Sequence, residues 1–373
     1  MKWLFLLALV LIGYGSLYPF DFRAAGAPFS RLLEPSPSSR GDLLENLALF
    51  LPWGYLGMVA WRRPPRPLRF VIVVLTGAVY AALLQWAQLY LPTRDPTLRD
   101  VVPNTLGAAA GAFAGCVPFL DVRRLGGDAR LRPAPFVLIG FWLAYRLVPF
   151  VPSLDWQEWK DSLKPLRAWR PFPWVGALHD AAAWASVGCL WAAAQPRWRT
   201  VRWLPLLAMM TIGLEVVIVD NRLSPATVAG AALGVVAAVV LRFRPAPAAL
   251  LLAGALVLSG LSPFAAREAP RSFAWVPFAG FLDGSMLLNT QSIFEKAFFY
   301  GALVWLGREA GLRLGVAAGG TALLLLGIEV AQTRFSDHTP EVTDPLLALF
   351  AALFLRLADA PRPPPNPVES PAR

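Results

Sequence analysis

The stretch LRFVIVVLTGAVYAALLQWAQLYL at residues 68–91 carries a single charged side chain, Arg69. A helix needs roughly 20 mostly apolar residues to cross the hydrocarbon core of a bilayer. This stretch is long and apolar enough, so it predicts a membrane-spanning helix.

The rest of the chain repeats this pattern. Of its 373 residues, 56% are hydrophobic and 16% are charged, against roughly 25% charged in a soluble domain. This composition excludes a soluble enzyme, a disordered protein and a disulfide scaffold, and it predicts an all-α, polytopic transmembrane helical bundle. About twelve spans are expected, at residues 3–19, 43–61, 68–91, 103–119, 134–152, 174–194, 201–220, 225–243, 246–262, 292–307, 314–332 and 343–357.

The net charge of +10 is distributed as a topology signal and not as a nucleic-acid surface. Nineteen Lys and Arg residues lie in the even-numbered loops and the termini, and 13 lie in the longer odd-numbered loops. Cytoplasmic loops carry the excess of Lys and Arg. We therefore expect a multi-pass protein of the bacterial cytoplasmic membrane with both termini in the cytoplasm. The first span could instead be a cleaved signal peptide, since Lys2 precedes it and AAGA follows at 24–27.

The spans fall into three copies of one unit. A span ends in Pro-Phe at 18–20, 148–150 and 262–264, and a long outer loop follows each time. Repetition of this kind indicates tandem structural units. We predict four-helix units at 1–119, 134–243 and 246–357, the second one degenerate, and a disordered proline-rich tail at 361–373.

The first unit resembles the VanZ-like family. The resemblance lies in DLLENLALFLPWGYLG at 42–57 and LLQWAQLYLPTRDPTLRDVVPNTLGAAAGAFAG at 83–115. Gln85 departs from the pattern, because the family usually has Glu there, and the third unit has Glu329. The resemblance implies an integral membrane protein, and the founding member is associated with lowered susceptibility to teicoplanin. The positions that match the family pattern are Asn46, Phe50, Pro52, Gly54, Gln88, Arg94, Asp100, Asn104, Gly107 and Gly111.

Polar side chains inside the predicted spans are candidates for a ligand site. A charge at mid-bilayer costs roughly 2.5–3.5 kcal/mol, so these groups should face the bundle or a wet cavity. The predicted topology brings Glu45 near Gln85, His179 near Glu215, and Glu295 near Glu329, all toward the outer side. The candidate ligand-binding residues are Glu45, Asn46, Gln85, Gln88, Arg94, Asp100, Asn104, Glu295, Lys296, Glu329, Gln332, Arg334 and Asp344.

A structural interpretation of the same residues stays open. They could be helix caps and neutralising pairs, such as Glu329 with Arg334 or Glu295 with Lys296. If a pocket exists, it is expected to use unit one or unit three and not the middle unit, which lacks the downstream acid. Arg94 and Asp100 on one outer loop would then hold each other and present guanidinium donors to an anionic headgroup.

Two further motifs predict packing and location. The spacings Gly107-x-x-x-Gly111 and Gly230-x-x-x-Gly234 favour close helix contact within the chain. WQEWKDSLKPL at 156–166 reads as a short amphipathic helix in the membrane interface, or as an ordinary aromatic belt.

Three classes of function remain. The first is a non-enzymatic cell-envelope protein that affects glycopeptide susceptibility or handles a lipid-linked ligand. The second is a secondary transporter, and the third an intramembrane enzyme using Glu and His as acid and base. Membrane lipid is the expected partner and nucleic acid is not. No cofactor or metal is expected, since two His and two Cys residues far apart do not suit a zinc site.

Overall fold

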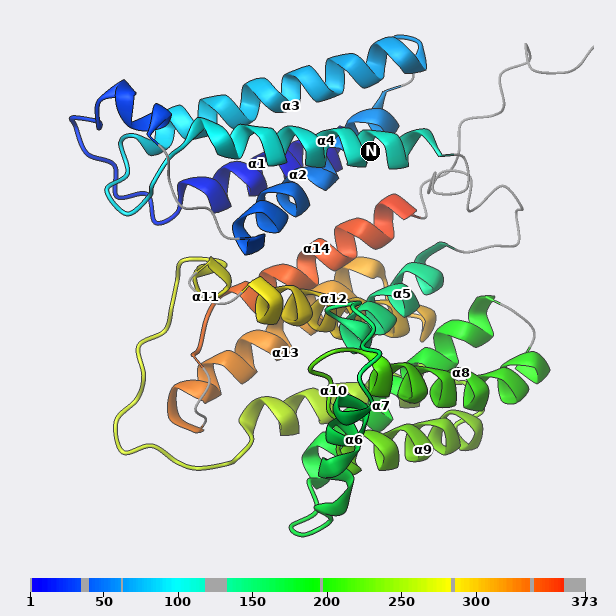
Figure 1. The fold of residues 1–373 in the computed structure, drawn as a ribbon. Coiled ribbons are helices and arrows are strands. Elements are labelled where there is room, and N and C mark those ends of the chain that lie inside the picture. Colours follow the sequence, from blue (N-terminus) through cyan, green and yellow to red (C-terminus); the bar gives the residue numbers. More distant parts are fainter. Residues whose placement is uncertain are drawn as a thin grey trace, which may run out of the picture. The chain divides into compact units, whose positions relative to one another are not determined.

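The computed structural model describes residues 2–34, 40–61, 63–117, 133–194, 197–282, 286–335 and 339–358. The regular secondary structure of this part of the chain is helical, apart from two isolated β-bridges (Figure 1). The chain divides into two compact structural units, residues 1–131 and residues 132–373. The first contains the first predicted four-helix unit, and the second contains the other two. The two structural units are called the first unit and the second unit below and are described separately. The predicted tail at 361–373 lies outside the described residues.

The first unit packs its helices through glycine. Its elements are α1 (Lys2–Leu17), η1 (Phe29–Leu33), α2 (Arg40–Ala60), α3 (Arg66–Gln88), η2 (Leu98–Asp100) and α4 (Val101–Cys116). A Cβ atom placed on Gly107 or Gly111 would lie 2.1 Å from the carbonyl oxygens of Leu47 and Leu51 on α2. Only glycine permits this approach of α4 to α2, and the predicted small-residue contact is confirmed.

The second unit contains the remaining helices around one aromatic core. They are α5 (Pro133–Leu147), α6 (Trp156–Leu163), η4 (Lys164–Arg167), α7 (Trp174–Ala194), α8 (Arg197–Val217), α9 (Pro225–Val240), α10 (Pro245–Leu261), α11 (Ala279–Leu282), α12 (Met286–Glu309), α13 (Leu314–Phe335) and α14 (Thr343–Ala358). Trp142, Trp184 and Phe298 are fully buried in its core. Gly230 and Gly234 bring α9 against α7, as their spacing predicts.

Each of the twelve predicted spans lies on one helix, with ends that differ by a few residues. By length and composition, α3, α13 and residues Thr200–Val217 of α8 can cross a membrane, and α1, α5, α9 and α10 are shorter apolar helices. On α3 the exposed side chains include Val71, Leu75, Val79 and Leu83, which recur at helical spacing. A long apolar stripe exposed on the protein surface suits contact with lipid. The chain is a multi-pass, all-helical membrane protein.

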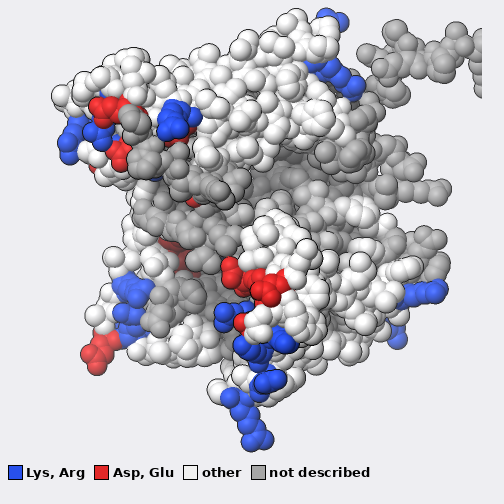
Figure 2. Space-filling view, in the orientation of Figure 1, with Lys and Arg blue, Asp and Glu red and all other residues white. Residues whose placement is uncertain are grey.

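Charged side chains are sparse on the face of the protein that Figure 2 shows. On the face shown in Figure 2, uncharged atoms cover most of the surface, and the charges gather toward the ends of the helices. The predicted interfacial segment forms α6, which Asp155 caps by accepting a hydrogen bond from the Gln157 amide at 2.8 Å. Over 273–290, the described part contains the one-turn α11 and the start of α12.

The same turn follows α1, α5 and α10. Phe20, Phe150 and Phe264 have φ angles of 67°, 63° and 64°. Each of their amides donates to the carbonyl of a leucine three residues earlier, at 2.9, 2.7 and 2.8 Å respectively. These are the Pro-Phe sites of the sequence.

The loops after the turns that follow α1 and α10 make matching backbone hydrogen bonds. The amides of Arg23 and Ala27 donate to carbonyls at the end of α3, and the amides of Arg267 and Arg271 donate to carbonyls at the end of α13. The four bonds are Arg23 N to Tyr90 O at 2.9 Å, Ala27 N to Leu89 O at 2.8 Å, Arg267 N to Arg334 O at 2.8 Å and Arg271 N to Thr333 O at 2.9 Å.

Candidate functional site

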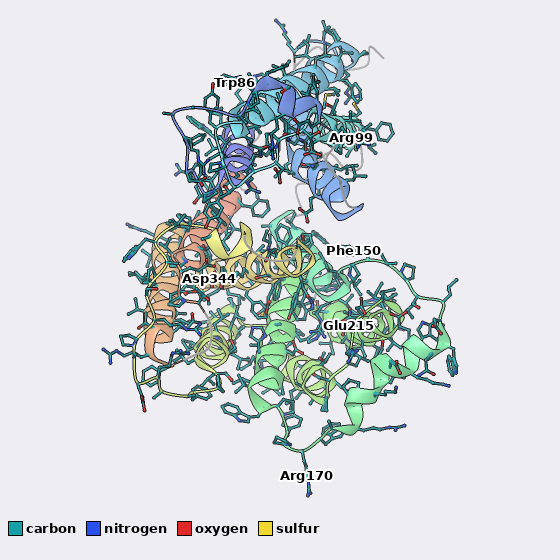
Figure 3. All side chains as sticks on the ribbon, turned by 60° about the vertical axis from the view of Figure 1, so that its left-hand side comes forward. Trp86, Arg99, Phe150, Arg170, Glu215 and Asp344 are labelled. Carbon is teal, nitrogen blue, oxygen red and sulfur yellow. The ribbon has the colours of Figure 1, made fainter. Side chains whose placement is uncertain are left out.

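A cavity of about 470 Å³ opens among helices of the second unit. It is bounded by α7, α10, α12 and α13, by the segment at 339–341 and by the first turn of α14. Its polar wall contains Glu295, Lys296, Glu329, Glu341 and Asp344. Figure 3 shows Asp344 within the second unit, near the start of α14.

Asp344 is the most strongly held of these carboxylates. The Lys296 ammonium lies 2.5 Å from its Oδ1, and the Tyr300 hydroxyl donates to its Oδ2 at 2.5 Å. Charge-assisted hydrogen bonds of this length are strong and fix the geometry of both partners. Lys296 therefore pairs with Asp344, and more distantly with Glu341 at 3.8 Å, in place of the expected partner Glu295.

Glu329 lines the cavity and also holds its wall together. Its Oε2 accepts a hydrogen bond of 2.7 Å from the amide of Glu341, which fixes the segment ahead of α14. Gln332, one turn later, donates to the Gly260 carbonyl at 2.9 Å. Arg334 is exposed at the end of α13 and contributes its backbone carbonyl to the turn described above.

Acidic side chains outnumber basic ones in the lining of the cavity. Four carboxyl groups line it, and Lys296 is the one basic side chain among the described lining residues that carries a full charge at neutral pH. A buried charge costs several kcal/mol unless a partner compensates it. One ammonium faces four carboxyl groups, so the cavity offers acceptors for hydrogen-bond donors and acidic groups that can pair with a positive charge.

Apolar side chains complete the cavity. Leu256, Leu325 and Ile328 line it, and the His179 ring stacks on Phe299 with 4.1 Å between ring centroids. His179 thus belongs to the cavity wall and does not meet Glu215. The middle predicted unit contributes to the pocket through α7, although the sequence assigned it no part.

A second charged cluster lies nearby in the same unit, and it is closed. Arg146 binds Glu215 through two hydrogen bonds of 2.6 and 2.8 Å and reaches Asp180 at 3.2 Å. All three side chains are at least nine-tenths buried. Asn221 donates to the Arg146 carbonyl at 2.8 Å and fixes the end of α5. This paired geometry indicates a structural ion cluster.

In the first unit the corresponding predicted residues form neutral hydrogen bonds. Gln85 accepts a bond of 2.9 Å from the Thr97 amide, across the same 12-residue separation that joins Glu329 to Glu341. Gln88 donates to the Ser16 carbonyl at 2.7 Å, across the same 72-residue separation that joins Gln332 to Gly260.

The other predicted residues of the first unit do not assemble into one site. Arg94 donates to the carbonyls of Tyr18 and Gly15 at the end of α1, in place of the expected bond to Asp100. Glu45 is exposed on α2, and Asn46 is half-buried one residue later.

Two members of this set sit at α4. Asp100 immediately precedes the helix, and Asn104 is buried in it. The Oδ1 of Asn104 has no hydrogen-bond partner within the described residues.

The geometry defines an all-helical, multi-pass membrane protein with a charged cavity among its helices. Residues 5–119 match the family model VanZ/LLP1, so this part of the chain is a VanZ/LLP1 family domain, as its motifs indicate. No curated protein and no solved structure matches the chain.

Proposed function

We propose that this chain is a non-enzymatic cell-envelope protein that handles a lipid-linked ligand. The observation that carries the proposal is the cavity of the second unit, where carboxylates face leucine and isoleucine side chains. An amphipathic ligand would place its chain against Leu256, Leu325 and Ile328. Its headgroup, rich in hydroxyl, amide or ammonium donors, would meet Glu295 and Glu329.

The carboxylates are fixed by hydrogen bonds, and this favours ligand binding over catalysis. Both oxygens of Asp344 are engaged by Lys296 and Tyr300, and one oxygen of Glu329 is engaged by the Glu341 amide. A general base needs an atom within hydrogen-bond reach of the proton that it abstracts, and three of these carboxylate oxygens already accept bonds from protein donors. Carboxylates fixed by protein donors instead suit a preorganised binding surface.

The three-unit architecture is part of the proposal. It is supported by the common turn after α1, α5 and α10 and by the hydrogen bonds that recur at equal separations in the first and last predicted units. On this basis residues 246–357 are a second VanZ-like unit, in which the neutral position of Gln85 has become Glu329. The middle unit, 134–243, keeps the turn and the ion cluster. Twelve spans with both termini in the cytoplasm complete this arrangement.

An effect on susceptibility to teicoplanin-type glycopeptides tests the proposal in cells. A double variant, Glu295→Gln with Glu329→Gln, keeps the size and one acceptor oxygen of both side chains and removes their acidic groups. We expect it to abolish any change in glycopeptide susceptibility that expression of the wild-type chain causes. Glu268→Gln, on an exposed loop residue, is the matched control and should behave as wild type. An unchanged phenotype in the double variant, at equal membrane levels, would remove the cavity from the proposed function.

A secondary transporter is the second candidate, favoured by the excess of carboxyl groups inside the helical unit. Buried acids in membrane helices often mark ion or proton pathways. Purified protein in liposomes should then show ligand-dependent proton flux that the double variant loses. Binding without flux would favour the first candidate.

A further inference from the structure

A pocket in the first unit has the opposite charge to the cavity of the second. It measures about 410 Å³ and lies where the loop after α1 runs along the end of α3. Arg23, Arg31 and Arg94 line it together with Gln88, and no acidic side chain is among its described lining residues. The family resemblance points to Arg94 alone, and the structure adds the other two arginines.

The three arginines are held to different degrees. Arg94 is fixed, because its Nε and Nη2 donate to the carbonyls of Tyr18 and Gly15 at 3.0 and 3.3 Å. Arg31 makes a 2.7 Å ion pair with Asp95, but both side chains are exposed, at 49% and 78%, so solvent screens the pair. Arg23 has no ion pair within the part of the chain that the structure describes. Asp95 thus offsets one positive charge, and weakly.

We propose that this pocket binds a phosphate group. Guanidinium groups donate two parallel hydrogen bonds to phosphate oxygens and remain charged at every physiological pH. A dianionic phosphomonoester can accept hydrogen bonds from two or three guanidinium groups at once, which is more than a single carboxylate can. The proposal stands apart from the cavity of the second unit and uses none of its residues.

The size of the pocket indicates that the phosphate carries an attached group. A water molecule takes up about 30 Å³ in the liquid, so a pocket of about 410 Å³ is several times larger than a bare phosphate requires. Its other walls include Ala25, Ala27 and Leu91, which suit a glycerol or acyl segment. Free phosphate and a phospholipid headgroup present the same chemistry to the arginines, and the experiment separates them.

Binding to the purified full-length chain in detergent micelles tests the proposal. The probes are inorganic phosphate and the short-chain lipid dihexanoyl phosphatidic acid, used below its micelle concentration. We expect saturable binding of the lipid, with phosphate binding more weakly. Arg23→Gln and Arg31→Gln should each weaken binding roughly tenfold, the loss of one charge-assisted contact. Arg94 is left intact because it caps α1.

Arg170→Gln is the matched control, because Arg170 lies at an exposed loop tip and points away from the helices (Figure 3). It should bind as wild type does. Size-exclusion profiles and unfolding temperatures of all variants confirm that they fold. Equal affinity for both probes would show that the phosphate group alone is sufficient for binding. A preference for the lipid would show that the pocket recognises a phospholipid headgroup. The proposal is overturned if neither probe binds, or if Arg23→Gln and Arg31→Gln bind as tightly as wild type.

Discussion

At the scale of single residues, a neutral side chain and an acidic side chain make the same backbone hydrogen bond in two parts of the chain. Gln85 and Glu329 each accept one backbone amide bond across 12 residues, at 2.9 and 2.7 Å. Both an amide oxygen and a carboxylate oxygen can accept this bond. The backbone role therefore permits either residue, and the fold does not require an acidic group at position 329.

Substitutions at Glu329 should separate its two roles. Glu329→Gln keeps an acceptor for the Glu341 amide, so we expect an unfolding temperature close to wild type. Glu329→Ala leaves that buried amide without a partner, which costs about 1–3 kcal/mol. Thermal unfolding in detergent measures both. A Gln variant as unstable as the Ala variant would show that the charge itself supports the fold.

Arg146 makes the clearest stability prediction. Removing one partner of a buried ion cluster typically costs about 3–5 kcal/mol, because the remaining charges stay buried without compensation. Arg146→Ala should therefore strongly lower the unfolding temperature, and removal of Asp180 and Glu215 in the same chain should restore part of the loss. Arg170→Ala, at the exposed loop tip, should have no effect. A stable Arg146→Ala protein would mean that the cluster contributes little to the fold.

At the scale of helices, the sequence predicts which segments form helices and which helix faces pack closely better than it predicts which side chains form ion pairs. Apolar runs predict that a helix exists, and each of the twelve predicted segments appears as a helix whose ends differ by a few residues. Glycine spacing predicts which faces approach closely, as Gly107 and Gly111 show. Ion-pair partners depend on helix rotation and on loops, so Lys296 was expected beside Glu295 and lies on Asp344 instead.

Residues outside the predicted spans complete the cavity. Glu341 lies in the short segment ahead of α14, and only the folded chain brings its amide to Glu329. Its one signal in the sequence is the acidic spacing Glu341-x-x-Asp344. Arg146 stands out as an arginine within an apolar span, but the sequence does not say which acids it binds.

The contact between α2 and α4 yields a prediction at this scale. Gly111→Ala places a methyl group 2.1 Å from the Leu51 carbonyl oxygen, so the helices must move apart. Overpacking of this kind costs about 1–3 kcal/mol. The unfolding temperature should fall, whereas Gly319→Ala, where no atom lies within 4 Å, should leave it unchanged or raise it. Equal stability of the two variants would contradict the close packing of α4 on α2.

At the scale of the whole molecule, the charge asymmetry of the loops predicts the topology. The 19 basic residues of the even loops and termini, against 13 in the odd loops, predict cytoplasmic termini. Alkaline phosphatase fused within the 263–291 loop should be active, and fused after Ala360 it should be inactive. The reverse pattern would overturn the sidedness on which an outward-facing pocket depends.

The central claim is that the carboxylate-lined cavity of the second unit holds a ligand. Native mass spectrometry of the full chain, extracted from membranes in mild detergent, tests it most directly. We expect an adduct of defined mass on the wild-type protein and on Glu268→Gln, and its loss from the variant with Glu295→Gln and Glu329→Gln. A double variant that folds and retains the same adduct, or a wild-type protein that carries none when supplied with total membrane lipid, would contradict the claim.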